Sequence, residues 1–162
     1  MKKLLLEYMI IGIAVLFAGC EDQYVSKIPD YQVNLNLNLT ANYPIFKNSI
    51  NEYLLFDTMD GFPVNNRIGY GGILVCTAPY LDDSGNSIYY AYDMCCPYEA
   101  DKNIKVYPVE DDIGKVQCEE CGSIFDVGFG SGFPQSGPAA EKGYVLKQYK
   151  TTLSGDYLYI YR

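Results

Sequence analysis

Apolar and polar residues alternate without exception along residues 31–39. A period of two residues is typical of a β-strand that buries one face and exposes the other. We therefore predict a half-buried strand in this segment. Its inward face is expected to carry Tyr31, Val33, Leu35, Leu37 and Leu39, while asparagines occupy most of its outward face.

Short apolar or aromatic runs continue through the rest of the chain. Residues 73–76 and 88–92 flank a polar segment at 82–86 that is rich in Asp, Ser, Gly and Asn, which predicts a β-hairpin. Further strands are predicted at residues 104–109, 116–118, 144–149 and 157–161, with a turn at 154–156. Residues 46–56 fit both a helix and a buried strand. Six or more short strands joined by turns predict an all-β fold, a sandwich or small barrel.

The N-terminal residues follow a different pattern. Lys2 and Lys3 precede an apolar stretch at residues 9–18 that is too short to span a bilayer comfortably and ends in Ala-Gly-Cys. Leu16-Phe17-Ala18-Gly19-Cys20 resembles the lipobox of bacterial lipoproteins, with Phe17 where Leu is usual. The resemblance implies cleavage before Cys20 and lipidation of this residue. The acidic pair after Cys20 is similar to surface-export signals of Bacteroides-type lipoproteins.

A membrane anchor that stays attached, with Cys20 unmodified, is the alternative, and both interpretations export the rest of the chain. We expect a signal peptide at residues 1–19, a polar tether at 20–30 and a single domain at 31–162. The expected location is the cell envelope, with contact to the membrane through the lipid anchor.

Composition narrows the chemistry further. Twenty acidic residues outnumber 12 basic ones and give a net charge of -8, so a nucleic-acid partner is not expected. An apolar fraction of 49% is that of a folded chain. The sequence contains no histidine, which removes every mechanism that requires an imidazole base or ligand.

Six cysteines carry the remaining candidate chemistry. With Cys20 assigned to lipidation, five are left, and an odd number cannot all form disulfides within one chain. A hairpin turning near Ser84 places Cys76 across from residue 91 or 92, out of register with Cys95, so we expect Cys76 to be free and buried. Cys95-Cys96 and Cys118-Glu119-Glu120-Cys121 remain. The second pair is a CxxC, compatible with zinc, an iron-sulfur cluster or a redox disulfide.

The surroundings of these cysteines resemble the Rieske iron-sulfur family. A predicted strand leads into Cys96-Pro97-Tyr98, a second segment reads Cys118-Glu119-Glu120-Cys121-Gly122-Ser123-Ile124-Phe125-Asp126, and Ser136-Gly137-Pro138-Ala139 follows. The resemblance covers roughly residues 68–162. It implies a Rieske-like antiparallel β sandwich or barrel with an inserted subdomain at about residues 94–139, in which Ser123 donates toward the cofactor and Gly137 and Pro138 cover it.

The chain departs from the family at both histidine positions, which hold Tyr98 and Cys121. The resemblance then implies a metal site on Cys96, Cys118 and Cys121, with Cys95 or Tyr98 as fourth ligand. Thiolate-only coordination suits an iron-sulfur cluster or zinc. Two metal-free alternatives stay open: a disulfide between Cys96 and Cys118, and thiol exchange by the CxxC.

Two functional classes follow from these alternatives. The first is a lipoprotein whose Rieske-like domain binds a metal centre through cysteines and transfers electrons to another envelope or redox protein. The second is a non-redox binding or structural module that meets an envelope protein or a glycan. Catalysis by this chain alone is not expected, because an oxygenase requires a histidine-bound iron. The acidic pairs at 111–112 and 119–120 are expected to be solvated rather than catalytic.

Overall fold

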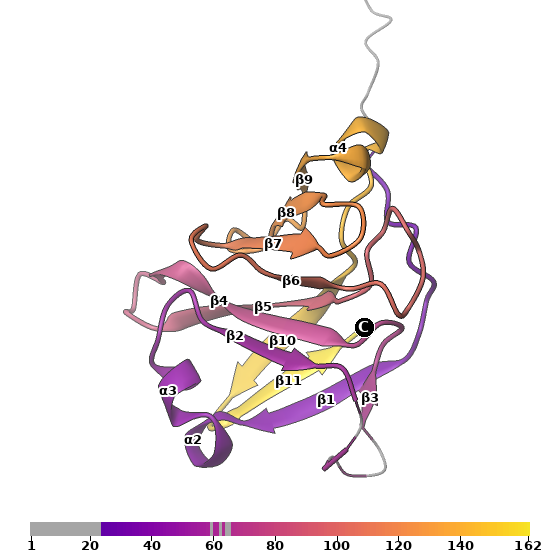
Figure 1. The fold of residues 1–162 in the computed structure, drawn as a ribbon. Helices are drawn as coiled ribbons and strands as arrows, with labels where there is room; N and C mark the ends of the chain where they lie inside the picture. The colour runs from indigo at the N-terminus through magenta and orange to yellow at the C-terminus, as the bar shows by residue number, and fades with distance from the viewer. Residues whose placement is uncertain (1–23, 59, 62, 64–65) are drawn as a thin grey trace, which may run out of the picture.

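Two antiparallel β-sheets make up the fold (Figure 1). The computed structural model describes residues 24–58, 60–61, 63 and 66–162. The larger sheet is nearly closed into a barrel and has the strand order β2-β4-β5-β10-β11-β1-β3, whereas the smaller sheet has the order β6-β7-β8-β9. The predicted all-β class is therefore confirmed. The predicted signal peptide and Cys20 lie outside the described residues.

The strands of the larger sheet are β1 (Val33–Asn38), β2 (Tyr53–Phe56), β3 (Arg67–Ile68), β4 (Ile73–Leu81), β5 (Ser87–Asp93), β10 (Gln148–Ser154) and β11 (Tyr157–Tyr161). Those of the smaller sheet are β6 (Val106–Pro108), β7 (Lys115–Cys118), β8 (Ile124–Asp126) and β9 (Pro134–Ser136). The described residues also form three short helices: α2 (Leu39–Asn42), α3 (Pro44–Lys47) and α4 (Pro138–Lys142). Within the described part of the chain, no helix has the length and apolarity needed to cross a membrane.

The alternating segment forms β1, as predicted, and pairs with β11 and β3. Val33, Leu35 and Leu37 are buried, and the residues between them face outward. The strand ends where the Asn38 side chain accepts a hydrogen bond from the backbone N–H of Ala41 and so caps α2. The expected inward position of Tyr31 is wrong. This residue precedes the strand and is 52% exposed, because pairing begins only at Val33.

The hairpin of β4 and β5 is also present, but its register differs from the prediction. Cys76 pairs with Tyr90, not with residue 91 or 92, because a β-bulge between Thr77 and Leu81 shifts the register. Cys76 is a free, buried thiol, as expected, and its sulfur lies 3.5 Å from the carbonyl oxygen of Val127.

Three of the other predicted strands correspond to β6, β7 and β11, and the mixed segment at 46–56 contains the end of α3 and all of β2. The strand predicted at 144–149 overlaps β10 only at its last two residues. Its earlier part is not a strand, because the backbone N–H groups of Val145 and Leu146 donate to Val25 and Gly132 rather than to a neighbouring strand. Five elements were not predicted from the sequence: α2, β3, β8, β9 and α4. Each is only two to five residues long, too short for a period to be recognised.

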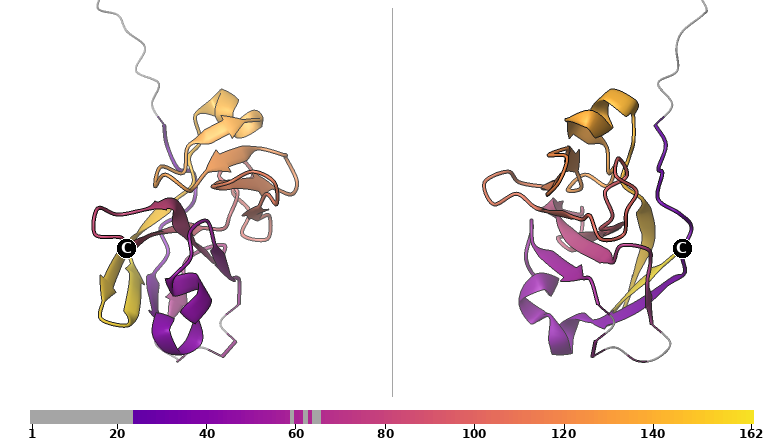
Figure 2. Two further views of the ribbon diagram at one scale, coloured as in Figure 1. Left: turned by 90° about the vertical axis from the view of Figure 1, so that its left-hand side faces the viewer. Right: turned by 45° about the vertical axis from the view of Figure 1, so that its right-hand side comes forward.

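The β4–β5 hairpin is buried on both of its faces. Ile73, Val75 and Ala91 belong to a core inside the larger sheet. Leu74 and Tyr92, which alternate with them, belong to a second core that includes the smaller sheet. Figures 1 and 2 show the smaller sheet stacked over this hairpin, with α2 and α3 at the other end of the molecule.

A buried carboxylate closes the end of the hairpin nearest the cysteines. Asp93 Oδ1 accepts hydrogen bonds from the backbone N–H groups of Gly71 and Cys95, both at 2.9 Å. Its Oδ2 accepts from the backbone N–H of Tyr70 at 2.8 Å and from the Tyr149 hydroxyl at 2.6 Å. Asp93 thus joins the 70–71 segment and β10 to the segment that contains Cys95 and Cys96.

Asp93→Ala is expected to lower the free energy of unfolding by on the order of 4 kcal/mol, because four donors, three of them buried and one part-buried, lose their acceptor. Tyr149→Phe removes only one of these donors and is expected to cost about 1 to 2 kcal/mol. Urea denaturation measures both. The exposed Asp83→Ala is the control, and an Asp93→Ala midpoint equal to that of the control would contradict the proposed role of the carboxylate.

Candidate metal centre

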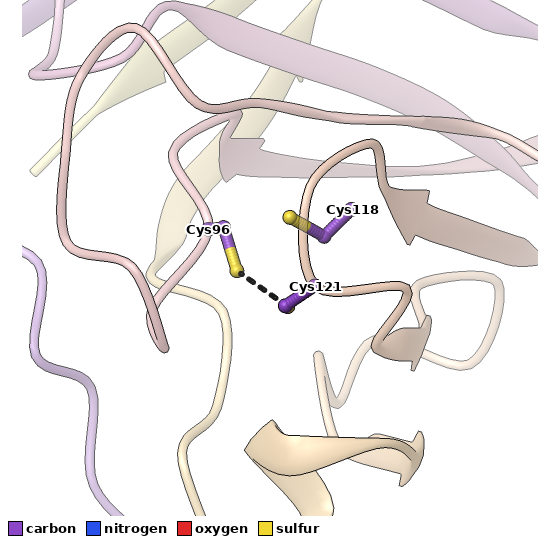
Figure 3. Close-up of side chains that lie close together, drawn as sticks. All are labelled: Cys96, Cys118 and Cys121. Carbon is purple, nitrogen blue, oxygen red and sulfur yellow. Dashed lines mark hydrogen bonds between the residues drawn. The ribbon is translucent and has the colours of Figure 1, made fainter.

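The side chains of Cys96, Cys118 and Cys121 converge in the second core (Figure 3). Their three sulfur atoms all lie within 4.8 Å of one another, and those of Cys96 and Cys121 are 3.7 Å apart. Cys96 and Cys118 are buried, whereas Cys121 is partly exposed. All three are free thiols. Sequence reasoning singled out the same three residues, which lie on two separate segments of the chain.

The backbone around Cys96 explains why it, and not Cys95, joins this group. Successive side chains of an extended segment point to opposite sides. The Cys95 sulfur accordingly lies against the carbonyl oxygens of Asp101, at 3.3 Å, and Cys96, at 3.5 Å. The expectation that Cys95 supplies a fourth ligand is therefore not met by this arrangement.

Tyr98, the other predicted fourth ligand, lies in the loop that follows Cys96. The backbone N–H of Cys96 donates to the Ile104 carbonyl, and the N–H of Ala100 donates to the Cys96 carbonyl. Both hydrogen bonds lie within the loop and hold its two ends together. The Tyr98 side chain is 40% exposed. No described Cys, Asp or Glu beyond the three cysteines joins the group.

The CxxC forms a tight turn between β7 and β8. The N–H of Gly122 donates to the Cys118 carbonyl at 3.1 Å, and the N–H of Cys118 donates to the Ser123 carbonyl at 3.0 Å. Gly122 has a φ of 70°, a left-handed conformation that glycine adopts without strain. The turn brings the Cys118 and Cys121 sulfurs to the same side.

Ser123 connects this turn to α4. Its hydroxyl oxygen accepts a hydrogen bond from the backbone N–H of Ala139 at 3.0 Å and lies 3.2 Å from the Cys121 sulfur. A Cβ atom at Gly137 would lie 2.8 Å from the Ser123 Cα, so only glycine permits this approach. Gly137 and Pro138 thus lie beside Ser123, and α4 begins next to the cysteine group.

The three thiols differ in acidity. Burial raises the pKa of Cys96 and of Cys118, although backbone N–H groups of Tyr98 and Glu99 near the first, and of Glu120 and Cys121 near the second, oppose this effect. Burial also acts to raise the pKa of Cys121, but hydrogen bonds from the Ser123 hydroxyl and backbone outweigh it. The pKa of Cys121 is therefore lowered.

The distance between the Cys96 and Cys121 sulfurs matches that of two ligands on a single tetrahedral metal ion. Zinc–thiolate bonds of about 2.3 Å place two ligands of a tetrahedron about 3.8 Å apart. The observed Cys96–Cys121 separation of 3.7 Å agrees with this value. In a binuclear cluster, ligands on different irons lie farther apart than ligands on one iron, and four protein ligands are required. The group fits one ion with three protein ligands.

A Rieske cluster does not fit these residues. One of its two irons is bound by two imidazoles, and the chain contains no histidine. The positions at which the resemblance expects histidine hold the exposed Tyr98 and the thiol of Cys121, which lies in the same group as Cys96 and Cys118.

Two further contributors to the site are backbone groups, which have no side-chain signal in the sequence. They are the N–H of Ala139 and the N–H groups that face the Cys96 and Cys118 sulfurs. The acidic residues at 111–112 and 119–120 are exposed, as expected.

Gly137→Ala is expected to disturb the Cys121 thiol, because the added Cβ would push Ser123 out of position. Gly85→Ala is a matched control: both glycines have a φ of 81°, but nothing lies within 4 Å of a Cβ at Gly85. Because both glycines have a positive φ, each substitution adds backbone strain of about 1 to 3 kcal/mol, and only the one at Gly137 adds a clash with Ser123. The rate of Cys121 alkylation, followed by peptide mass spectrometry, should change in the first variant alone. Equal rates in the two variants would show that Gly137 does not position the site.

No family model, no curated protein and no solved structure matches this chain. The assignment of the site therefore depends on its geometry and on the chemistry of its donor atoms.

Proposed function

We propose that this chain is an exported, lipid-anchored envelope protein whose Rieske-like β domain binds one metal ion, Zn²⁺ or Fe²⁺, through Cys96, Cys118 and Cys121. The convergence of three sulfur atoms within 4.8 Å carries the proposal. Thiolates are soft ligands, and both ions accept them. With three protein ligands, the ion keeps a fourth position for a ligand from outside the chain. Bound iron would allow the electron transfer expected from the sequence.

A disulfide module is the second candidate, and the short distance between sulfurs favours it as well. The Cys96 and Cys121 sulfurs lie 3.7 Å apart, so a short movement would allow them to form a disulfide. The Cys96–Cys118 disulfide inferred from the resemblance would join two sulfurs that also lie within 4.8 Å. Either bond would form in an oxidising envelope and would leave no metal site.

Protein purified under reducing conditions without chelator is expected to bind about one equivalent of Zn²⁺ or Fe²⁺, measured by elemental analysis. Replacing a direct ligand, as in Cys118→Ser, should weaken binding by more than the roughly 10- to 100-fold typical of outer-shell changes. Cys95→Ser is the matched control, because its sulfur lies against Asp101, and it should retain the metal.

Thiol titration of the unfolded protein under non-reducing conditions separates the two candidates. The metal-binding form has five free thiols at positions 76, 95, 96, 118 and 121. A metal-free protein with three free thiols would establish the disulfide module instead. A metal-free protein with five free thiols would contradict both candidates.

The lipid anchor has its own test. Intact mass of the membrane-extracted protein is expected to show loss of residues 1–19 and a lipid on Cys20. Cys20→Ala should abolish both changes and release the protein from the membrane fraction, because one or more acyl chains supply the binding free energy. A wild-type protein that retains Met1 would contradict the anchor without bearing on the metal site.

A further inference from the structure

The first described residues are fixed to the domain rather than extending freely from it. The backbone N–H of Val25 donates to the Gly143 carbonyl at 3.0 Å, and the N–H of Val145 donates to the Val25 carbonyl at 3.2 Å. Val25 thus forms a parallel bridge with Tyr144, directly after α4. Ile28 is buried, and the Lys147 ammonium group donates to the Ile28 and Pro29 carbonyls. The described part of the predicted tether is therefore docked.

This docking limits how far the domain can lie from residue 20. Val25 lies five positions after Cys20, and an extended chain spans at most about 3.6 Å per position, so the reach is about 18 Å at most. A lipid on Cys20 would therefore hold the α4 end of the domain close to the bilayer. Figures 1 and 2 show the chain joining the domain at this end, beside α4 and away from α2 and α3.

An exposed apolar group lies at the same place. Tyr24, Val25 and Phe133 are 49%, 42% and 44% exposed, and we call these three residues the N-terminal patch. The rings of Tyr24 and Phe133 are 4.8 Å apart, so the patch is continuous across the chain's entry and the start of β9. None of the three side chains is charged. Aromatic side chains of this kind are favoured at the level of lipid headgroups.

We propose that the N-terminal patch rests on the lipid bilayer, so that the end of the domain that carries α4 and the cysteine group faces the membrane. The proposal rests on the lipidation of Cys20 in the proposed function but not on the metal. The limited reach and the apolar contact act together, because the anchor brings the patch to the surface and the patch then fixes the orientation. Its uncharged character suits a zwitterionic surface despite the chain's net charge of -8.

The same orientation brings the cysteine group near the bilayer. Gly143, which accepts from Val25, lies only four residues after Ala139, which donates to Ser123 beside Cys121. One short helix, α4, therefore separates the patch from the site. A ligand or redox partner of this site would have to approach along the membrane surface.

The sequence contains no tryptophan, so one introduced indole reports its surroundings without background. Phe133→Trp places the indole in the patch. Ile45→Trp is the matched control, because Ile45 is 77% exposed and lies in α3, at the other end of the molecule. Both full-length proteins are expressed with their lipid, checked by intact mass, and reconstituted into phosphatidylcholine vesicles with or without bromine on the acyl chains.

Brominated lipid is expected to reduce the fluorescence of Phe133→Trp about twofold and to leave that of Ile45→Trp nearly unchanged, because quenching requires contact with the acyl region. Tyr24→Trp should be quenched like Phe133→Trp. Because it places the indole at a second position of the patch, it tests the orientation even if Phe133→Trp does not fold. Lipidated, vesicle-bound proteins in which positions 133 and 45 are quenched equally, or not at all, would overturn the orientation alone. Unlipidated proteins that stay in solution would overturn both the anchor and the orientation.

Discussion

Burial of both faces of the β4–β5 hairpin is the constraint on which the rest of the structure depends. The hairpin must lie between two apolar layers, so the larger sheet curves around one face and the smaller sheet covers the other. At the end of β5, the Asp93 carboxylate accepts hydrogen bonds from the backbone N–H groups of Gly71 and Cys95. These groups would otherwise be buried without a partner. The position of Cys96 is therefore fixed by the packing of the hairpin as well as by its own loop.

Local patterns predicted the parts of this fold that local forces determine. The alternation along β1 and the turn chemistry of the β4–β5 and β10–β11 hairpins act over a few residues, and β1 and both turns form where the sequence places them. β10 begins at Gln148, later than the strand predicted at 144–149. The partner of Cys76 depends on a bulge between Thr77 and Leu81. Pro79 lies in this segment and is typical of a bulge, but it does not give the size of the register shift, and the predicted register was off for that reason. Tyr31 continues the alternation but has no strand beside it to pair with, so its periodicity does not produce burial.

The candidate site, like the fold, was predicted only in part from local patterns. A CxxC before a glycine predicts a turn that directs two sulfurs to one side, and spacing alone supports this. The Cys96 sulfur reaches the other two only because the smaller sheet is stacked on the β4–β5 hairpin. The residue pattern did not predict this stacking, which was implied by the resemblance alone. The choice between Cys95 and Cys96 depends on which side of an extended backbone faces the second core. The resemblance assigned Cys96 to the group and left Cys95 as a possible fourth ligand. The residue pattern alone could not exclude Cys95, because both residues are equally suited to burial.

The acidity of the three thiols indicates how a metal ion would enter the site. Burial keeps the pKa of Cys96 and Cys118 high, so without a metal they are neutral and pack as small apolar side chains. Cys121 is partly exposed and has a lowered pKa, so it is the first to become a thiolate and the first that an incoming ion meets. Coordination by the other two must release their protons, which makes affinity rise with pH. Cys96 and Cys118 are thus neutral in the empty site, and they become charged only when a bound cation balances the charge.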